Sequence, residues 1–304
     1  MTRTQIIAHL QGIFPPVVTP FDRRGEVDLG AFRENVARYV GIGMGGILVT
    51  GSTGEAPYLT ERERLKLVEV ARDVVKPPEL LIVGTGLEST RETLRLSREV
   101  VARGADALLV VTPNYYKSRM DAPALIAHYR TVADGVRRPV LIYSIPQFTG
   151  IHIDTATIAT LSRHPNIRGL KESSGDLSFV KRVLRRVRPG FRVLVGSVQI
   201  LLDALRAGSV GGVLGQADYA PDLCVGVYEA FLHRRIATAR DLQRRLMPLA
   251  QKINVPYGVA GVKAAMDLAG YRGGAPRPPL IPLDAGARRK VTAALQEARQ
   301  GLEF

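Results

Sequence analysis

A lysine and a tyrosine end two consecutive apolar runs of this sequence. The run Val140–Tyr143 ends in Tyr143, and the next run, Arg168–Lys171, ends in Lys171. A neutral lysine amine attacks a carbonyl to form a Schiff base, and burial away from water favours that neutral form. A phenol beside it could relay protons to and from the reaction intermediates. The alternatives are a lysine that reaches solvent and a tyrosine that only packs.

Hydroxyl groups and glycines follow other apolar runs. After the run Gly46–Thr50 comes Gly51-Ser52-Thr53-Gly54-Glu55, in which two hydroxyls between glycines could hold a carboxylate. The alternative is a glycine-rich turn whose hydroxyls cap a helix. A phosphate-binding loop is excluded because the Gly-Lys-Ser/Thr ending is missing. Further run ends carry phenols or glycines: Tyr115 and Tyr116, Gly196 and Ser197, and Gly211 to Val213.

Eight short apolar runs alternate along the chain with longer amphipathic stretches, which is typical of parallel β/α units. The runs are Ile13–Val18, Gly46–Thr50, Leu81–Gly84, Ala107–Thr112, Val140–Tyr143, Arg168–Lys171, Arg192–Val195 and Gly211–Leu214. Because all eight lie within residues 1–235, we predict an α/β fold, a closed (β/α)₈ TIM barrel. The alternative is an open doubly wound sheet.

The barrel fold predicts where the chemistry lies, because the active sites of such barrels are built at the carboxyl ends of the strands. Strand alternation places Gly169 and Lys171 on one face and Leu170 on the other. Leu170 suits the face that helices cover. We therefore expect Lys171 to point into the barrel, with Gly169 leaving space for its long side chain.

Helix start signals separate the runs. Thr60 to Glu63 and Ser89 to Glu92 have the pattern of capping boxes, and Asp154 and Asp176 that of N-caps. Beyond residue 235 the strand signals stop, and three stretches have helical patterns, at 237–253, 261–268 and 284–300. We predict two domains, a catalytic barrel over residues 1–235 and a C-terminal helical extension over residues 236–304.

The composition is that of a soluble globular protein, with 46% hydrophobic and 23% charged residues among 304. The N-terminus lacks the apolar core of a signal peptide, and no stretch approaches the roughly 18 apolar residues of a membrane span. Cys224 is the only cysteine, which excludes an intrachain disulfide and a cysteine-based metal site. A cytoplasmic protein without membrane partners is expected.

The net charge of +14 raises the question of nucleic acid. The basic residues recur at solvent-side helical positions, as in residues 181–192, without an aromatic platform or a zinc-finger pattern. We interpret them as solvated helix faces and expect no nucleic-acid partner. A basic field would still attract anionic substrates such as keto acids.

The motifs together resemble the dihydrodipicolinate synthase/N-acetylneuraminate lyase family of class I aldolases. The resemblance runs nearly end to end, from the segment 12–21 to the C-terminal helices. Its strongest motifs are Gly51-Ser52-Thr53-Gly54-Glu55, Tyr143-Ser144-Ile145-Pro146 with Thr149-Gly150, and Gly169-Leu170-Lys171-Glu172.

The resemblance implies a role for each matching residue. Lys171 matches the Schiff-base lysine and Tyr143 the proton-relay tyrosine. Thr53 matches the residue that binds the pyruvyl carboxylate, with Ser52 in the relay beside it. Tyr115 matches a relay tyrosine that family members insert from a neighbouring subunit, which implies a homo-oligomer, a dimer or a tetramer.

Further contacts also follow from the resemblance. Val213 matches a backbone contact to pyruvate. Because the lysine imine itself serves as the electron sink, no metal and no organic cofactor are expected. The expected partners are a small 2-keto acid, pyruvate, and an aldehyde.

Phe148 distinguishes between branches of this family. Synthases that use aspartate semialdehyde carry an arginine just before the Thr-Gly pair, where it binds the second carboxylate. This sequence has Phe148 there, and a phenyl ring cannot make bidentate contacts to a carboxylate.

Other segments resemble 4-hydroxy-2-oxoglutarate aldolase, among them 111–116, 164–167 and 270–274. In that branch Ser173 and Gly196 match substrate contacts. The branch usually has asparagine where Thr53 stands, so the match is incomplete.

The function expected from these residues is cleavage of 4-hydroxy-2-oxoglutarate to pyruvate and glyoxylate. The alternatives are condensation of pyruvate with aspartate semialdehyde by a dihydrodipicolinate synthase, and another pyruvate-dependent aldolase. A non-catalytic barrel that only binds keto acids is a further alternative, but it would not need both Lys171 and Tyr143.

Overall fold

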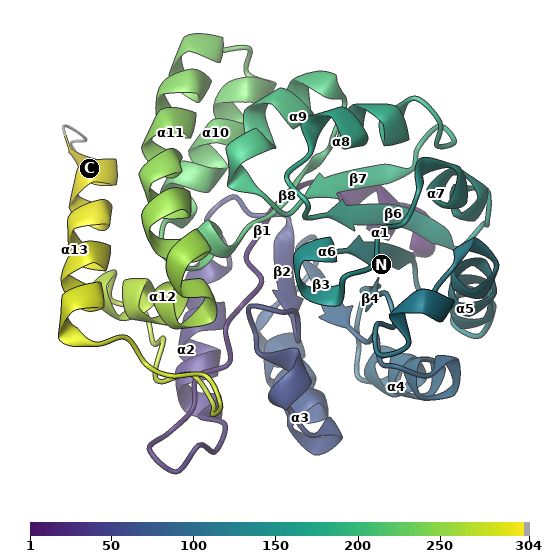
Figure 1. The fold of residues 1–304 in the computed structure, drawn as a ribbon, viewed down its shortest axis with the longest axis horizontal. Coiled ribbons are helices and arrows are strands. Elements are labelled where there is room, and N and C mark those ends of the chain that lie inside the picture. The colour runs from purple at the N-terminus through teal and green to yellow at the C-terminus, as the bar shows by residue number, and fades with distance from the viewer. Residues whose placement is uncertain (301–304) are drawn as a thin grey trace.

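Eight parallel strands form one sheet in the computed structural model, which describes residues 1–300 (Figure 1). The strands are β1 (Gly12–Phe14), β2 (Gly46–Val49), β3 (Leu80–Gly84), β4 (Ala107–Val111), β5 (Val140–Ser144), β6 (Ile167–Glu172), β7 (Arg192–Val195) and β8 (Gly211–Val213). They are hydrogen-bonded in the order β1-β8-β7-β6-β5-β4-β3-β2.

Two backbone hydrogen bonds close this sheet into a barrel. Gly45 N donates to Ile13 O and Leu48 N donates to Pro15 O, each at 3.0 Å, so the segment that begins with β1 also lies beside β2. The predicted (β/α)₈ barrel is confirmed, and the alternative of an open doubly wound sheet is wrong.

Helices follow the strands and surround the barrel (Figure 1). They are α2 (Leu29–Tyr39), α3 (Glu61–Val74), α4 (Thr90–Ala102), α5 (Ala122–Asp134), α6 (Pro146–Thr149), α7 (Thr155–Ser162), α8 (Leu177–Leu184), α9 (Leu201–Ala207) and α10 (Pro221–Leu232).

All four predicted helix starts are confirmed: the capping box at Thr60 and the N-caps Ser89, Asp154 and Asp176. The box at Ser89 forms only by half. Ser89 Oγ accepts from Glu92 N at 3.1 Å, but the Glu92 carboxylate accepts from Arg95 at 2.8 Å instead of reaching back to the cap. A nearby guanidinium has taken the place of the backbone N–H.

The first strand is shorter than the predicted run Ile13–Val18 because Pro15 and Pro16 follow Phe14, and proline has no N–H to donate to a sheet. Before this strand lies α1 (Arg3–His9), for which the sequence analysis predicted no element. The carbonyl of Ile7 accepts from Arg192, the first residue of β7, at 3.2 Å. Helix α1 therefore lies at the amino end of the barrel.

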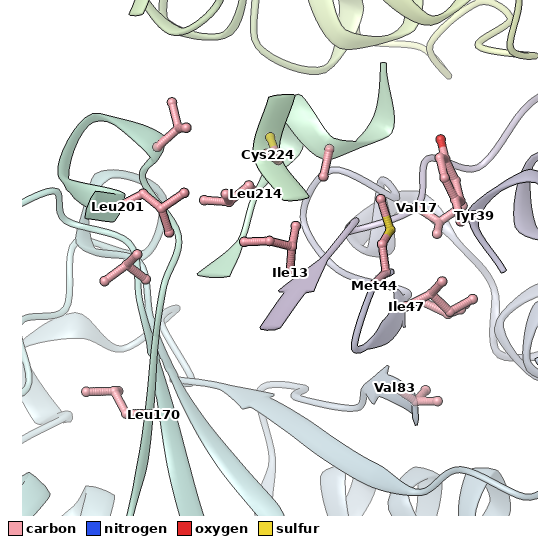
Figure 2. Close-up of a cluster of buried hydrophobic side chains, with 14 of the residues drawn as sticks. Ile13, Val17, Tyr39, Met44, Ile47, Val83, Leu170, Leu201, Leu214 and Cys224 are labelled. Carbon is pink, nitrogen blue, oxygen red and sulfur yellow. The ribbon is translucent and has the colours of Figure 1, made fainter. Parts of the chain in front are cut away.

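Two apolar clusters separate the inside of the barrel from its helical layer. The inner cluster holds Phe14, Leu48, Leu109, Leu141 and Tyr143 together with Ile6 of α1. The outer cluster fills the space between strands and helices, and its members include Ile13, Ile47, Leu170 and Cys224 (Figure 2). Alternation along each strand thus gives one face to each cluster.

The C-terminal extension consists of α11 (Ile236–Leu249), a π-helical turn (Ala250–Asn254), α12 (Val255–Leu268) and α13 (Ala285–Arg299). Figure 1 shows these helices along one side of the barrel, with α11 beside α10. Helix α12 is kinked at Gly258, where φ is 51° and ψ is −135°. No helix within residues 1–300 has both the length and the apolar character required to cross a membrane.

His128 on α5 makes a pH-dependent contribution to this fold. The side chain is buried, and its Nδ1 lies 2.9 Å from Thr90 Oγ1. Burial lowers its pKa from the usual 6.5 to about 4, against the opposing charge of Glu88. The unfolded chain therefore takes up this proton at a higher pH than the folded chain does.

We predict that the wild type loses roughly 2 to 3 kcal/mol of unfolding free energy between pH 7.5 and 4.5 that His128→Gln does not lose. The sign follows from the depressed pKa: the stability from neutral His128 is complete above about pH 6.5 and declines toward pH 4. Urea unfolding of both proteins at the two pH values measures the difference. Equal losses would contradict the assignment.

Candidate active site

Lys171 and Tyr143 lie side by side on neighbouring strands at the carboxyl ends of β5 and β6. They are register partners, and Tyr143 belongs to the inner cluster of the barrel. Lys171 is 4% exposed, and its Nζ lies 4.2 Å from the centroid of the Tyr143 ring. The predicted inward orientation of Lys171 is confirmed, and an amine on the solvent side of the barrel is excluded.

The reason that position 169 requires a glycine differs from the one predicted. A Cβ at this position would lie 2.5 Å from the main-chain oxygen of Arg192 on β7 and 3.4 Å from Leu141 Cγ. The close approach of two strands therefore requires the glycine. Space for the Lys171 side chain is not the cause.

The turn after β2 brings a hydroxyl to the tyrosine. Ser52 Oγ lies 3.3 Å from Tyr143 OH. Thr50, just before the turn, has a φ of 55°, which is strained for a β-branched residue. The Thr50 hydroxyl donates a hydrogen bond to Gly84 O at 2.8 Å. A Cβ on Gly84 would lie 2.1 Å from Thr50 O, so only glycine fits beside this residue. Tight contact with β3 thus fixes this turn.

A cavity of about 750 Å³ lies at this end of the barrel. Three of the predicted residues line it: Ser52, Tyr143 and Phe148. Lys171 is not part of the cavity wall, and its amine lies against the Tyr143 ring. The structure therefore joins the predicted lysine, phenol and hydroxyl into one site that opens to a space large enough for two small substrates.

The remaining predicted residues lie at or just after the carboxyl ends of other strands and of β6. Thr53 lies beside the backbone after β8, where a Cβ on Gly215 would be 3.9 Å from its Oγ1. Val213 belongs to the inner cluster with Tyr143. Ser173 and Gly196 touch, since a Cβ on Gly196 would lie 1.8 Å from Ser173 Oγ.

Tyr115 stands apart from the others. Its side chain is 76% exposed and packs edge-to-face on Tyr116, with ring centroids 5.1 Å apart. Its N–H donates to Glu88 at 2.8 Å, while its neighbour Asn114 lines the cavity. A single chain therefore does not bring Tyr115 to Lys171.

Two buried carboxyl groups lie near the lysine. Burial raises the pKa of Glu172, the residue after Lys171, although Ser174 N donates to it at 2.9 Å. Burial also raises the pKa of Asp218 well above its usual range, against the opposing charge of Lys171. Both carboxyls are thereby shifted toward the neutral form.

The C-terminal extension supplies part of the cavity wall, which the sequence motifs did not predict. Tyr257, Gly258 and Val259 of α12 line the cavity, as do Leu280 and Ile281 from the segment after it. A signal was present, because Pro256 and Gly258 interrupt this helical stretch, and such residues bend a helix out of its regular course. No group of three or more His, Cys, Asp or Glu side chains within residues 1–300 could hold a metal ion.

A buried lysine beside a phenol and a hydroxyl, at the carboxyl end of a (β/α)₈ barrel, defines a lyase of the class I aldolase type. A model of the dihydrodipicolinate synthetase family matches residues 9–298. The chain belongs to this family.

Similar proteins agree with this assignment. The 4-hydroxy-tetrahydrodipicolinate synthase of Methanopyrus kandleri is 36% identical over 274 residues, which cover 89% of this chain and 90% of that protein. The synthase of Archaeoglobus fulgidus is 34% identical over 286 residues, covering 94% and 97%.

Solved structures give the same result. Dihydrodipicolinate synthase of Thermotoga maritima has a TM-score of 0.90 and 30% identity, with 95% of this chain and 98% of that chain covered. A prophage protein of the dihydrodipicolinic acid synthase family from E. coli K12, solved in complex with pyruvate, has a TM-score of 0.90, 29% identity and the same coverage.

These comparisons correct one expectation. The likeness to 4-hydroxy-2-oxoglutarate aldolase is not supported as the main interpretation, because the curated relatives are named 4-hydroxy-tetrahydrodipicolinate synthase. The alternative from the sequence, a dihydrodipicolinate synthase, fits them better. Local likenesses in segments 111–116 and 270–274 weigh less than agreement along the whole chain.

We predict that Tyr143→Phe slows turnover of pyruvate-type substrates by about 10² to 10⁴, the usual range for a proton-relay group. The substitution keeps the ring that Lys171 Nζ contacts and removes only the OH that faces Ser52. Steady-state kinetics measure the loss, and trapping of the imine should stay measurable. Turnover within a few-fold of the wild type would show that Tyr143 only packs.

Proposed function

We propose that this chain is a lyase that forms a Schiff base between Lys171 and pyruvate and makes or breaks a carbon–carbon bond to an aldehyde. One observation carries the proposal: the Lys171 amine lies 4.2 Å from the Tyr143 ring, whose OH lies 3.3 Å from Ser52 Oγ. Nucleophile, proton relay and hydroxyl thus lie together at the carboxyl end of the barrel, where Tyr143 and Ser52 line the cavity, and imine chemistry needs this arrangement.

In the proposed mechanism, Lys171 attacks the C2 carbonyl of pyruvate and water leaves as the imine forms. Tyr143 takes a C3 proton, which gives an enamine, and the enamine carbon attacks the aldehyde; water then hydrolyses the product imine and frees the Lys171 amine. Tyr143 and Ser52 carry protons to the new alkoxide and to the leaving hydroxyl. Thr53 binds the pyruvyl carboxylate. The protonated imine is the electron sink, so the step requires no other cofactor.

The first candidate for the aldehyde is aspartate semialdehyde, which would make the product 4-hydroxy-tetrahydrodipicolinate. The names of the curated relatives support this candidate. The second candidate is cleavage of 4-hydroxy-2-oxoglutarate to pyruvate and glyoxylate. Phe148 favours it, because this exposed phenyl ring lines the cavity where an arginine would hold the carboxylate of aspartate semialdehyde.

We further propose that the chain works as a homo-oligomer, a dimer or a tetramer. The support is the exposure of Tyr115 and Tyr116, at 76% and 70%. Such aromatic side chains are enriched at protein interfaces. In an oligomer Tyr115 would enter the site of a neighbouring copy and extend its proton relay.

We predict that borohydride traps a covalent pyruvate adduct on Lys171. The physical reason is the place of this amine, 4.2 Å from the ring centroid of the proposed proton relay Tyr143. Peptide mass spectrometry should locate the adduct there, and Lys171→Ala should abolish it. The control is Lys252→Ala, because the Lys252 side chain is exposed and should form no adduct. Lys263 is unsuitable as a control site because its side chain is buried. An adduct on another lysine, or none, would overturn the mechanism.

We predict that Phe148→Arg raises kcat/KM for aspartate semialdehyde by about tenfold or more, the value of a charge-assisted hydrogen bond. Pyruvate trapping should not change. Ile281→Arg is the matched control, since Ile281 is an exposed apolar residue of the same cavity. Assays of the wild type with aspartate semialdehyde and 4-hydroxy-2-oxoglutarate decide between the two candidates. An unimproved Phe148→Arg would mean that another group binds the carboxylate.

A further inference from the structure

The C-terminal extension is joined to the active-site turn by a buried ion pair. Lys263 Nζ on α12 lies 2.6 Å from Glu55 Oε1, and both side chains are 1% exposed. Glu55 is the last residue of the turn that holds Ser52 and Thr53. A cation and an anion from segments about two hundred residues apart therefore meet at the turn that holds Ser52 and Thr53.

Lys263 has no contact with water, and protein groups surround its ammonium. Besides Glu55, it donates to Thr19 O at 2.7 Å and to Ala275 O at 2.9 Å. Its Nζ also lies 4.4 Å from the centroid of the Phe21 ring. Burial lowers the pKa of Lys263, and the charge of Glu55 opposes that shift. A buried ammonium is retained only where such partners offset the loss of hydration.

Glu55 is held as tightly from its own side. Its φ of 56° lies in the left-handed region, which costs a non-glycine residue free energy. Its Oε2 accepts from Arg277 N at 2.8 Å. The preceding carbonyl, of Gly54, accepts from Thr19 Oγ1 at 2.7 Å. The turn between Thr50 and Glu55 is therefore strained at both ends and fixed by its surroundings.

We propose that Lys263 and Glu55 are positioning residues: their ion pair holds the turn 51–55 in the shape in which Ser52 and Thr53 bind the carboxylate of pyruvate. The proposal rests on the proposed function, because it takes pyruvate as the ligand of that turn. It also makes the C-terminal extension a working part of the site, in agreement with the residues of α12 that line the cavity.

The backbone strain of the turn is offset by the contacts around it. A left-handed Glu55 and a left-handed Thr50 persist only while the contacts around them outweigh their cost. Removing the ammonium leaves a carboxylate buried without its cation, and the least costly response is for the turn to move that carboxylate toward water. Movement of the turn displaces Thr53 and Ser52 but leaves Lys171 on β6 in place.

The experiment measures pyruvate binding and imine capacity separately. Borohydride trapping at increasing pyruvate concentration gives a half-saturating concentration and a maximal adduct per chain. For Lys263→Met and for Glu55→Gln we expect the half-saturating concentration to rise roughly 10- to 100-fold, as for misplaced positioning groups. The maximal adduct on Lys171 should stay near that of the wild type.

Two further variants make the result specific. The double variant Lys263→Met with Glu55→Gln should recover part of the loss seen in Lys263→Met, because no unpaired charge remains. Lys252→Met is the matched control: it breaks the exposed ion pair Lys252–Glu297, of 2.5 Å, within the same extension and should bind pyruvate as the wild type does.

Circular dichroism establishes which variants fold. If Lys263→Met does not fold, Glu55→Gln tests the positioning role, because glutamine keeps the side-chain volume of Glu55 and can still accept a hydrogen bond from Arg277 N. Unchanged half-saturation in a folded variant overturns the positioning role. An equal loss of the maximal adduct also overturns it, because that is general damage to the barrel. Absence of an adduct in the wild type overturns the proposed function instead, so the two failures are distinct.

Discussion

The register between β5 and β6 is the constraint on which the site depends. Val140 pairs with Ile167, but Leu141 pairs with Gly169, so the ladder skips Arg168. This irregularity puts Tyr143 opposite Lys171. In an unbroken ladder Tyr143 would face Leu170, whose side chain belongs to the outer cluster. One inserted residue therefore decides whether phenol and amine share the inside of the barrel.

Alternation within one strand could be predicted from the sequence, and the register between strands could not. The run Arg168–Lys171 correctly indicated that Lys171 and Leu170 face opposite ways, because that needs only the period of two along a strand. The reason for Gly169 was wrong because the atom that crowds it, Arg192 O, belongs to another strand. Which backbone approaches a glycine depends on the closed barrel.

The same distinction explains the rest of the site. Ser52, Tyr143 and Lys171 were each predicted from a short motif of a few consecutive residues, and the structure brings the three residues together. The wall supplied by Tyr257 and Gly258, and the pair of Glu55 with Lys263, join segments far apart in the chain. A lysine in an apolar helical stretch was the available signal for the latter. Without the fold, that lysine does not indicate which acidic residue is its partner.

The charged side chains of the cavity hold its walls together. Glu55 is paired with Lys263, Glu88 accepts hydrogen bonds from Asn114 and Tyr115, and Arg64 donates to the carbonyls of Ala56 and Leu59. These contacts hold the segments around the cavity in place, which suits recognition of one keto acid. Phe148 and Ile281, which also line the cavity, are exposed apolar side chains that take no part in these polar contacts. Substitution of these two apolar residues would leave the polar contacts and Lys171 unchanged, so one Schiff-base site can serve different aldehydes.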